Sequence, residues 1–288
     1  MVNVFREALE KRRANLPPHT DAFRWSDEDV KGLVIDLFND VAIINAYRPI
    51  DAAELRDVAT ALSDVRPLRA VYVKHRPKEA PEAPVIGINI DSLVAHEAGV
   101  AFAIRPSNGI SVGLYVDSSQ GRAWLKANAR GRTVLNLFAY TCGFGINAQL
   151  GGAKRAVNVD ASRKVLDWGE QNAVLNDLRV DRLDYIAGDA FDWVRRFAKK
   201  KETFDIVVAD PPGFATTKTT RFSALTDYHR LAQACETVLA PGGTVLAMCN
   251  VEALTQSAFE AQLRRGAPSL KLTRMFNEGA VKCALLTR

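Results

Sequence analysis

The second half of the chain alternates between short apolar runs and longer stretches in which apolar residues recur with helical spacing. The apolar runs cover residues 133–138, 155–159, 183–187, 205–209 and 244–248. The helical stretches cover residues 162–175, 190–199, 228–239 and 251–264. A short run that is apolar throughout is typical of a strand buried on both faces of a parallel sheet. Regular alternation of such strands with helices predicts a Rossmann-like, doubly wound α/β sheet.

The rest of the chain has strand-like runs that are joined by turns. Runs at residues 270–275 and 281–286 flank a turn at Asn277–Gly279, which predicts a terminal antiparallel hairpin at one edge of the sheet. Near the other end, runs at Gly32–Phe38 and Val41–Tyr47 flank a tight turn at Asn39–Asp40, which predicts another hairpin. We expect three regions: a small α+β domain at residues 1–85, a β-rich connecting segment at 86–125 with strands near 93–97, 100–104 and 111–116, and the doubly wound domain at 126–288.

Polar and small residues follow the predicted parallel strands at the point where each one ends. Gly143 and Gly145 follow the first strand, Asp160 ends the second, and Asp189 follows the third. Asp210 follows the fourth strand, and Cys249 follows the fifth. In a doubly wound sheet, ligands bind outside the carboxyl ends of the strands. A carboxylate one strand away from a glycine-bearing loop suits the two hydroxyls of a ribose, so the pattern predicts a cofactor that contains a nucleoside.

Two cofactors fit this pattern. Gly143, Gly145 and Ala148 match the dinucleotide fingerprint G-x-G-x-x-G/A. The alternative is S-adenosylmethionine, which has a ribose and an adenine but no phosphate. The segment Asp210–Phe214, D-P-P-G-F, favours the alternative. Its two prolines remove backbone donors and leave carbonyl groups free to accept hydrogen bonds from a substrate amine or base edge, and its phenylalanine can stack on a base. A rigid turn with Phe214 in the core is the competing interpretation.

Composition and charge limit the classes of protein to which the chain can belong. The chain has 288 residues, of which 48% are hydrophobic and 25% charged, as in ordinary globular proteins. Its net charge of +5 permits a polyanionic partner such as RNA. The four cysteines form no C-x-x-C or zinc pattern, which predicts reduced thiols, no metal and a cytoplasmic location. No run approaches the ~20 apolar residues that a membrane span needs, so no membrane association is expected.

Several of these motifs are those of a known family. The strings NLFAYTCGFG, VDAS, QNAVLN, GDAFDW and DPPGF resemble class I S-adenosylmethionine-dependent methyltransferases of the ribosomal RNA large subunit methyltransferase I type, which are bacterial 23S rRNA 5-methylcytosine enzymes. The resemblance covers roughly residues 22–286. Residues 113–125 are similar to the family's opening motif G-x-x-x-D-x-R-x-x-R, in which Arg122 matches the second arginine and Ser119 replaces the first. We expect no RNA-binding PUA domain before the small α+β domain.

The resemblance implies a role for each matching residue. Phe138, Thr141 and Gly143 are expected to line the methionine end of S-adenosyl-L-methionine. Asp160, with Ser162 nearby, is expected to hold the ribose, and Asp189 with Ala190 to meet the adenine. Asp210 is expected to border the transferred methyl group. The expected substrate contacts are Pro211, Pro212, Phe214 and Arg122. In place of a PUA domain, the basic residues of the small domain are expected to dock RNA, namely Arg66, Arg69, Lys74, Arg76 and Lys78.

Cys249 decides which atom of the substrate is methylated. Carbon C5 of a pyrimidine is a poor nucleophile until a thiolate adds at C6, and Cys249 is placed to supply that thiolate. The triplet here is Met-Cys-Asn, where the family's 5-methylcytosine members resemble one another in Ser-Cys-Ser. We therefore expect an RNA methyltransferase that acts on a cytosine C5 of 23S rRNA, with Cys249 and Asp210 as catalytic residues. The alternatives are a buried structural cysteine with N-methylation of a purine or small metabolite, and a non-catalytic RNA-binding ribosome-assembly factor. The oligomeric state, including a homodimer, is left open.

Overall fold

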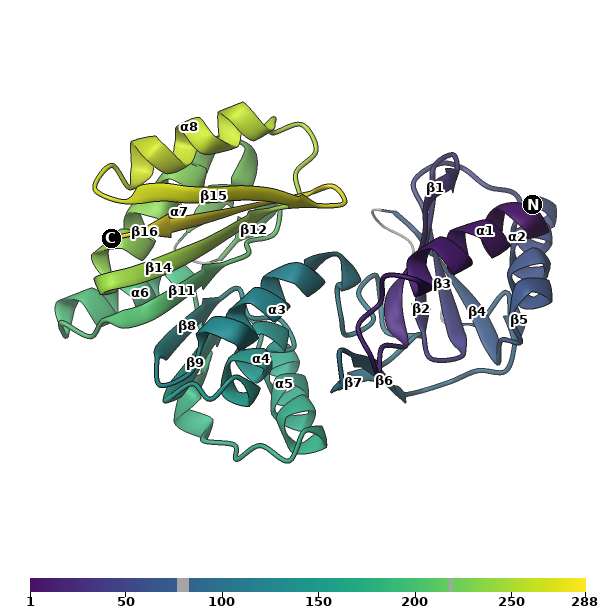
Figure 1. The fold of residues 1–288 in the computed structure, drawn as a ribbon, viewed down its shortest axis with the longest axis horizontal. Coiled ribbons are helices and arrows are strands. Elements are labelled where there is room, and N and C mark those ends of the chain that lie inside the picture. The colour runs from purple at the N-terminus through teal and green to yellow at the C-terminus, as the bar shows by residue number, and fades with distance from the viewer. Residues whose placement is uncertain (77–82, 218–219) are drawn as a thin grey trace. The chain divides into compact units, whose positions relative to one another are not determined.

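The computed structural model describes residues 1–76, 83–217 and 220–288. The chain forms two compact units, Met1–Val116 and Asp117–Arg288, which are described separately below (Figure 1). Among the described residues, no helix is both long enough and apolar enough to cross a membrane.

The first unit is built on a five-stranded sheet with helices on one face. Its strands follow in spatial order as β1 (Ala22–Val30), β2 (Leu33–Phe38), β3 (Val41–Ala46), β4 (Ala70–His75) and β5 (Ile86–Gly87). Only β3 and β4 are parallel, and α2 (Ala52–Val65) is the crossover between them. Asp51 starts α2 by accepting hydrogen bonds from the N–H groups of Ala53 and Glu54.

The helix-facing side of this sheet is the core of the first unit. Residues of α1 (Val2–Arg13), α2 and alternate strand positions share one apolar cluster, and the indole N–H of Trp25 donates to the carbonyl of Phe5 over 2.8 Å. A separate hairpin consists of β6 (Leu93–Glu97) and β7 (Val100–Ile104), as predicted. The strand predicted near residues 111–116 does not form, and a short 3-10 helix, η1 (Val116–Ser118), follows instead.

The second unit is a seven-stranded sheet with the predicted parallel core and terminal hairpin. Its spatial order is β10-β9-β8-β11-β14-β16-β15. The first five strands are parallel, whereas β16 is antiparallel to both of its neighbours. The strands are β8 (Thr133–Leu137), β9 (Arg155–Asp160), β10 (Tyr185–Ala187), β11 (Phe204–Ala209), β14 (Leu239–Cys249), β15 (Lys271–Glu278) and β16 (Val281–Thr287). The Rossmann-like fold expected from the alternating pattern is therefore confirmed.

Helices cover both faces of this sheet. Val207 and Ala209 of β11 belong to a core cluster with residues of α6 (Ala190–Lys199), α7 (Ala224–Thr237) and α8 (Gln256–Gly266). Ile206 and Val208 point the other way, into a cluster with residues of α3 (Ser119–Asn128) and α4 (Gly143–Leu150). The remaining long helix, α5 (Arg163–Leu175), lies beside α4. This burial on both faces explains why apolar residues predominate in the parallel strands.

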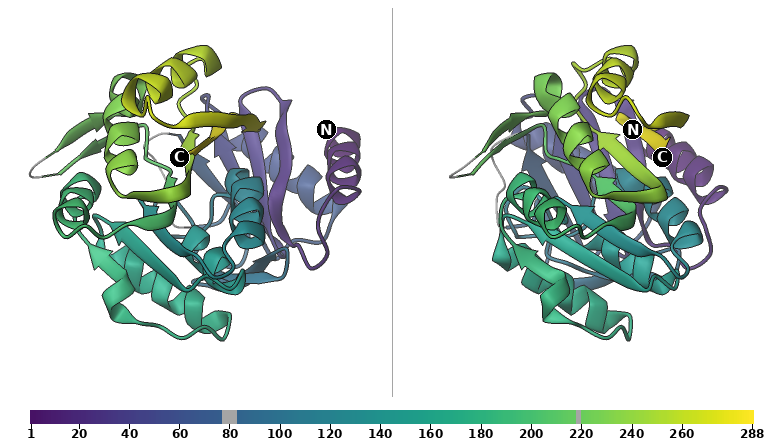
Figure 2. Two further views of the ribbon diagram at one scale, coloured as in Figure 1. Left: turned by 60° about the vertical axis from the view of Figure 1, so that its left-hand side comes forward. Right: turned by 90° about the vertical axis from the view of Figure 1, so that its left-hand side faces the viewer.

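One hairpin of the second unit has no counterpart in the predicted elements. Strands β12 (Phe214–Thr216) and β13 (Arg221–Ser223) pair antiparallel between the D-P-P-G segment and α7. Figure 2 shows this hairpin projecting from the body of the unit. It lies directly after Asp210, so its residues belong to the surroundings of the candidate site.

Candidate active site

The carboxyl ends of the five parallel strands meet at one edge of the sheet. Leu137 of β8 is in register with Val159 of β9 on one side and with Ala209 of β11 on the other. Asp160 is in register with Ala187 of β10, and Ala209 with Ala247 of β14. The loops that follow these strands therefore begin side by side, and together they form the rim of the site.

The loop after β8 has an unusual backbone. Phe138, Tyr140 and Cys142 adopt positive φ angles of 56°, 49° and 62°, although none of them is glycine. A non-glycine residue in this left-handed region costs roughly 1–2 kcal/mol, and such residues concentrate at functional sites. We call residues 138–142 the rim loop.

The two glycines after the rim loop belong to a helix. They lie inside α4, which begins at Gly143. A Cβ on Gly145 would lie 2.1 Å from Oδ1 of Asn158 in β9, so this glycine lets the helix approach the sheet. The match to the dinucleotide fingerprint therefore has a packing explanation.

Helix α5 braces the rim loop through three consecutive contacts. The ring of Trp168 lies 6.2 Å from that of Tyr140, measured between centroids. The side-chain amide of Asn172 donates to the carbonyl of Thr141 over 3.2 Å. A Cβ on Gly169 would lie 2.4 Å from the sulfur of Cys142, so only glycine fits there. The predicted cofactor residue Thr141 and its two neighbours thus depend on helix residues, of which Trp168 and Gly169 have no motif in the sequence.

Asp160 stands at the tip of β9 with its carboxylate held by the backbone. One oxygen accepts from the N–H of Tyr140 and the other from the N–H of Ser162, each over 2.9 Å. Burial raises the pKa of Asp160, and these two hydrogen bonds oppose the rise. Each carboxylate oxygen has a further lone pair, so the group can accept the two hydroxyls of a ribose. The donor and acceptor set therefore fits a nucleoside.

Asp189 caps α6 and at the same time holds the β12–β13 hairpin. Its Oδ1 accepts from the N–H of Asp192 over 3.0 Å, and its Oδ2 accepts from the hydroxyl of Thr217 over 2.7 Å. Ala190, the first residue of α6, is buried beside it. Both residues lie on the rim at the end of β10, where the sequence placed them.

Asp210 lies in an electrostatic cluster with Asp117 and Arg122. Burial of its carboxyl group and the negative charge of Asp117 raise its pKa to about 7, although the positive charge of Arg122 lowers it. Arg122 is itself buried on α3, with its guanidinium 5.8 Å from the centre of the Phe144 ring. A carboxyl group with this pKa can take up or release a proton near neutral pH.

The segment after Asp210 opens toward solvent. Pro211 is buried and Pro212 is exposed. Phe214 is 54% exposed, so the competing interpretation that it belongs to the core is wrong. The guanidinium of Arg221 lies over its ring at 5.4 Å from the centre. Ser119, which replaces an arginine of the family's opening motif, donates instead to Glu278 of the terminal hairpin.

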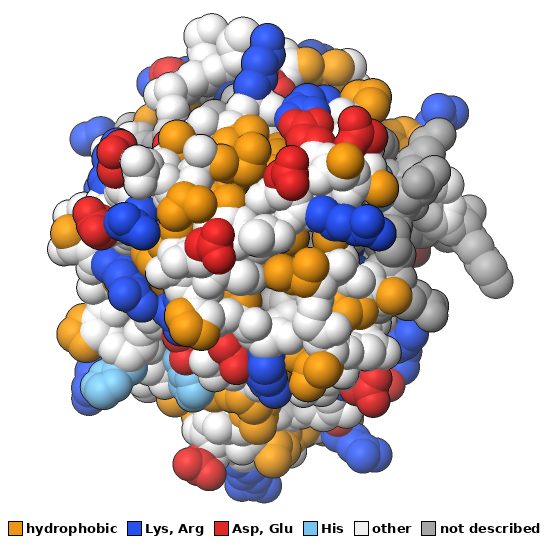
Figure 3. All heavy atoms as spheres, turned by 90° about the vertical axis from the view of Figure 1, so that its right-hand side faces the viewer, with side chains coloured by type: hydrophobic (Ala, Val, Ile, Leu, Met, Phe, Trp, Pro, Cys, Tyr) orange, Lys and Arg blue, Asp and Glu red, His pale blue; other side chains and the backbone are white. Residues whose placement is uncertain are grey.

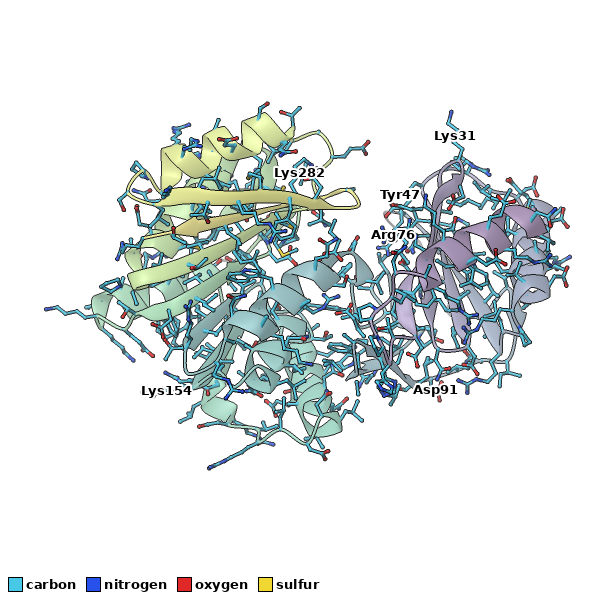
Figure 4. All side chains as sticks on the ribbon, viewed as in Figure 1. Lys31, Tyr47, Arg76, Asp91, Lys154 and Lys282 are labelled. Carbon is cyan, nitrogen blue, oxygen red and sulfur yellow. The ribbon has the colours of Figure 1, made fainter. Side chains whose placement is uncertain are left out.

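Cys249 ends β14 and is fully buried. It packs in the core cluster on the α6–α8 face of the sheet. Burial raises the pKa of its thiol, whereas a hydrogen bond from the backbone of Val251 and the charge of Lys282 on β16 lower it (Figure 4). Lys282 donates to the carbonyl of Val251 over 2.9 Å, which holds its charge near the sulfur.

Tyr228 joins the two strand tips that carry Asp210 and Cys249, and the sequence analysis did not single it out. Its hydroxyl lies 2.9 Å from the carbonyl oxygen of Ala209 and 2.8 Å from that of Met248, and it accepts from the N–H of Met248 over 3.0 Å. The only sequence signal for this role is a tyrosine on the apolar stripe of α7. We infer that this hydroxyl sets the spacing between β11 and β14 at the rim.

Replacement of Tyr228 by phenylalanine is expected to lower the free energy of unfolding by roughly 1–3 kcal/mol. The variant leaves buried backbone groups of Ala209 and Met248 without their partner, and this is the usual cost of an unsatisfied polar group. Urea unfolding followed by circular dichroism measures the change. Tyr47→Phe, at an exposed position, is the control. Equal unfolding midpoints for the two variants would contradict the role of the hydroxyl.

Comparison with known proteins identifies what this arrangement resembles. Residues 28–281 match the model of the S-adenosylmethionine-dependent methyltransferase family. The ribosomal RNA large subunit methyltransferase I of Aeromonas salmonicida is 32% identical over 241 residues, which are 81% of this chain and 61% of that protein. The ribosomal RNA large subunit methyltransferase K/L of a Psychrobacter species is 37% identical over 156 residues, which are 53% of this chain and 19% of that protein.

A solved structure extends the likeness to the whole chain. A protein described as a methyltransferase, in complex with S-adenosylhomocysteine, superimposes with a TM-score of 0.88 at 25% sequence identity. The match covers 100% of this chain and 82% of that one. By contrast, the chain spans about three fifths of the length of the Aeromonas salmonicida relative.

Proposed function

Because the chain belongs to the S-adenosylmethionine-dependent methyltransferase family, its cofactor is S-adenosylmethionine, and we propose that it methylates a base of large-subunit ribosomal RNA. When bound, this cofactor supplies a methyl group on a positively charged sulfur. The two bacterial relatives are named as ribosomal RNA methyltransferases, which supports ribosomal RNA as the substrate. The observation that carries the proposal is the pair formed by Asp210, whose pKa is about 7, and the exposed ring of Phe214 four residues later.

Each of the rim residues is proposed to bind a different part of the cofactor. Asp160 would accept the ribose hydroxyls through the lone pairs that its backbone donors leave free. Phe138, Thr141 and Gly143 would lie along the methionine end, while Asp189 and Ala190 would lie at the adenine. The hydrogen bond from Thr217 to Asp189 would then connect the cofactor site to the hairpin that begins at Phe214.

We further propose that the methylated atom is C5 of a cytosine and that Cys249 is the nucleophile. The sulfur of Cys249 would form a bond to C6, which makes C5 able to attack the methyl group. Asp210 would then take the proton from C5, and the thiolate would leave as the bond to C6 breaks. The positive charge of Lys282 lowers the pKa of the Cys249 thiol and supports this role, whereas the charge of Asp210 raises that pKa.

Methylation of an amino nitrogen is the second candidate, and the burial of Cys249 favours it. A buried thiol with a raised pKa is mostly protonated at neutral pH, which disfavours attack by its sulfur. In this reaction Asp210 and the carbonyl groups of the D-P-P segment would accept hydrogen bonds from the target amine. No bond to the protein would be needed.

Cys249→Ala separates the two candidates. If the C5 route is right, the variant loses methyl transfer to ribosomal RNA, whereas Cys235→Ala, which removes another buried thiol from the same core cluster, retains it. Transfer of labelled methyl groups measures the rate, and mass spectrometry of the nucleosides identifies the product. Full activity of Cys249→Ala with an N-methylated product would establish the second candidate.

The unmodified chain and the two cysteine variants also test the alternative that the protein is a non-catalytic ribosome-assembly factor. Calorimetric titration with S-adenosylmethionine is expected to show binding for the unmodified chain and for both cysteine variants. Cofactor binding together with no methylated product on any ribosomal RNA would contradict the proposed function as a whole.

A further inference from the structure

The excess positive charge of the chain lies in its second unit. Residues 117–288 contain 24 Lys and Arg against 17 Asp and Glu, a net charge of +7. Residues 1–116 contain 14 and 16, a net charge of −2. Figure 3 shows one face of the molecule, on which basic and acidic side chains are interspersed. A polyanion is therefore attracted to the second unit more than to the first.

The basic residues of the first unit that were expected to dock RNA are engaged in internal contacts. Arg69 pairs with both oxygens of Asp40, at 2.8 Å each. Lys74 is buried and donates to the carbonyl of Pro106 over 2.6 Å, and burial lowers its pKa to about 8. Arg76 donates to the side chain of Asn45, and Arg66 donates to the carbonyl of Asn39. Lys78 lies outside the described residues. These contacts weaken the case for phosphate binding by this cluster.

Three exposed arginines of the second unit lie over aromatic rings near the rim. The guanidinium carbon of Arg221 is 5.4 Å from the centre of the Phe214 ring, that of Arg230 is 5.8 Å from Phe191, and that of Arg196 is 4.7 Å from Trp193. We call Arg196, Arg221 and Arg230 the arginine surface. Within the described ranges, Arg196 and Arg221 form no ion pair with a carboxylate, and Arg230 is 3.9 Å from Asp227.

The arginine surface is joined to the rim by packing. The guanidinium of Arg230 donates to the carbonyl of Arg221 over 3.4 Å, which links α7 to the β12–β13 hairpin. Phe222, the neighbour of Arg221, is buried between Phe138 of the rim loop and Phe191 of α6, with ring centres 6.2 and 5.7 Å away. Arg221 is exposed while Phe222 is fixed in the core. The guanidinium of Arg221 is therefore held over Phe214, and that of Arg230 is held against the backbone of the same hairpin.

We propose that this arginine surface, together with the ring of Phe214, docks the single-stranded RNA segment that presents the target base. This inference rests on the proposed function and names the surface through which it acts. Guanidinium groups can bind phosphates, and an exposed aromatic ring can stack on a base, which is the combination that single-stranded nucleic acids require.

The test is the triple variant Arg196→Ala/Arg221→Ala/Arg230→Ala. Its control is Arg264→Ala/Arg265→Ala/Arg274→Ala, which removes the same charge from exposed arginines of α8 and β15, one of them also over an aromatic ring. We expect the test variant to raise the KM for RNA by at least about tenfold. Its slope of log affinity against log salt is expected to fall by roughly 2, at about 0.7 for each lost phosphate contact. Cofactor affinity, measured by calorimetry, is expected to be unchanged in both variants.

The outcomes distinguish a failure of the proposed docking surface from a failure of the proposed function. If the unmodified chain methylates ribosomal RNA, and the test variant keeps the KM and the salt slope of the control, the arginine surface is not the docking surface, although the proposed function stands. If the unmodified chain methylates no RNA, the proposed function itself fails. Competition by polyglutamate as strong as that by RNA of equal charge would overturn the RNA assignment in favour of an acidic protein.

Discussion

Replacement of Asp210 by asparagine is expected to lower the rate of methyl transfer by roughly 10²- to 10⁴-fold, the usual contribution of a general acid or base. The carboxyl group has a pKa of about 7 because it is buried beside Asp117. It can therefore accept a proton from C5 at neutral pH, whereas an amide cannot. The rate is measured at saturating cofactor, so that any change in cofactor affinity is separated from the chemical step. If the target is an amino nitrogen, the asparagine carbonyl still accepts its hydrogen bond, and much of the activity is retained.

The pH dependence of this variant gives an independent measurement. A base must be deprotonated to act, so the rate of the unmodified enzyme is expected to rise with pH through an inflection near pH 7. The folded pKa lies above the value of about 3.9 for an unfolded aspartate, so the folded state holds the proton more tightly. The stabilising contribution of Asp210 is therefore greatest below about pH 4 and decreases as the pH rises toward 7. Asp210→Asn removes both effects, and an unchanged inflection near pH 7 in the variant would assign the titration to another group.

Replacement of Gly169 by alanine is expected to displace the rim loop and to lower the rate at limiting cofactor by on the order of 100-fold, as a 1 Å displacement can do. The added Cβ would lie 2.4 Å from the sulfur and 2.9 Å from the Cβ of Cys142. By helix propensity alone, alanine in α5 would stabilise the helix by roughly 1 kcal/mol. A loss of cofactor affinity in calorimetry therefore reports the contact with the loop and not a weaker helix.

The second change Cys142→Gly is expected to restore cofactor binding to the Gly169→Ala variant. Glycine removes the two atoms that lie closest to the new Cβ, and it adopts the φ of 62° at this position without strain. Lys164→Ala, at an exposed position of α5, is the control for a change elsewhere on the helix. If the double variant binds cofactor no better than Gly169→Ala, the pair does not position the loop through this contact.

The sequence predicted the main sheet because its strands are buried on both faces. Each of β8, β9, β11 and β14 contains an apolar run. The end of the run predicted the carboxyl end of the strand. β12 and β13 have three residues each and lie mostly at the surface, so no run marks them. β1 contains acidic residues and two irregularities in its register with β2, which interrupt the alternation that identifies a strand.

The candidate site was predictable where topology alone brings residues together. Asp160, Asp189 and Asp210 lie on one rim because parallel strands share a direction. The side chains that support them were not predictable in the same way. Tyr228 and Gly169 act through contacts with residues distant in sequence, and neither has a motif. The burial of Cys249 was also not decided by the sequence, because a cysteine at a strand end fits either a nucleophile or a core residue.

The position of β16 in the sheet affects the order in which the protein folds during its synthesis. This strand lies between β14 and β15, although it follows both of them in the chain. A nascent chain folds from its N-terminal side as it is synthesised. The sheet position between β14 and β15 is therefore filled only after both of these strands have been synthesised. Until Thr287 has left the ribosome, β14 presents an unpaired edge that another strand could occupy. In newly synthesised molecules this edge of β14 is open to pairing with other strands until β16 takes its place.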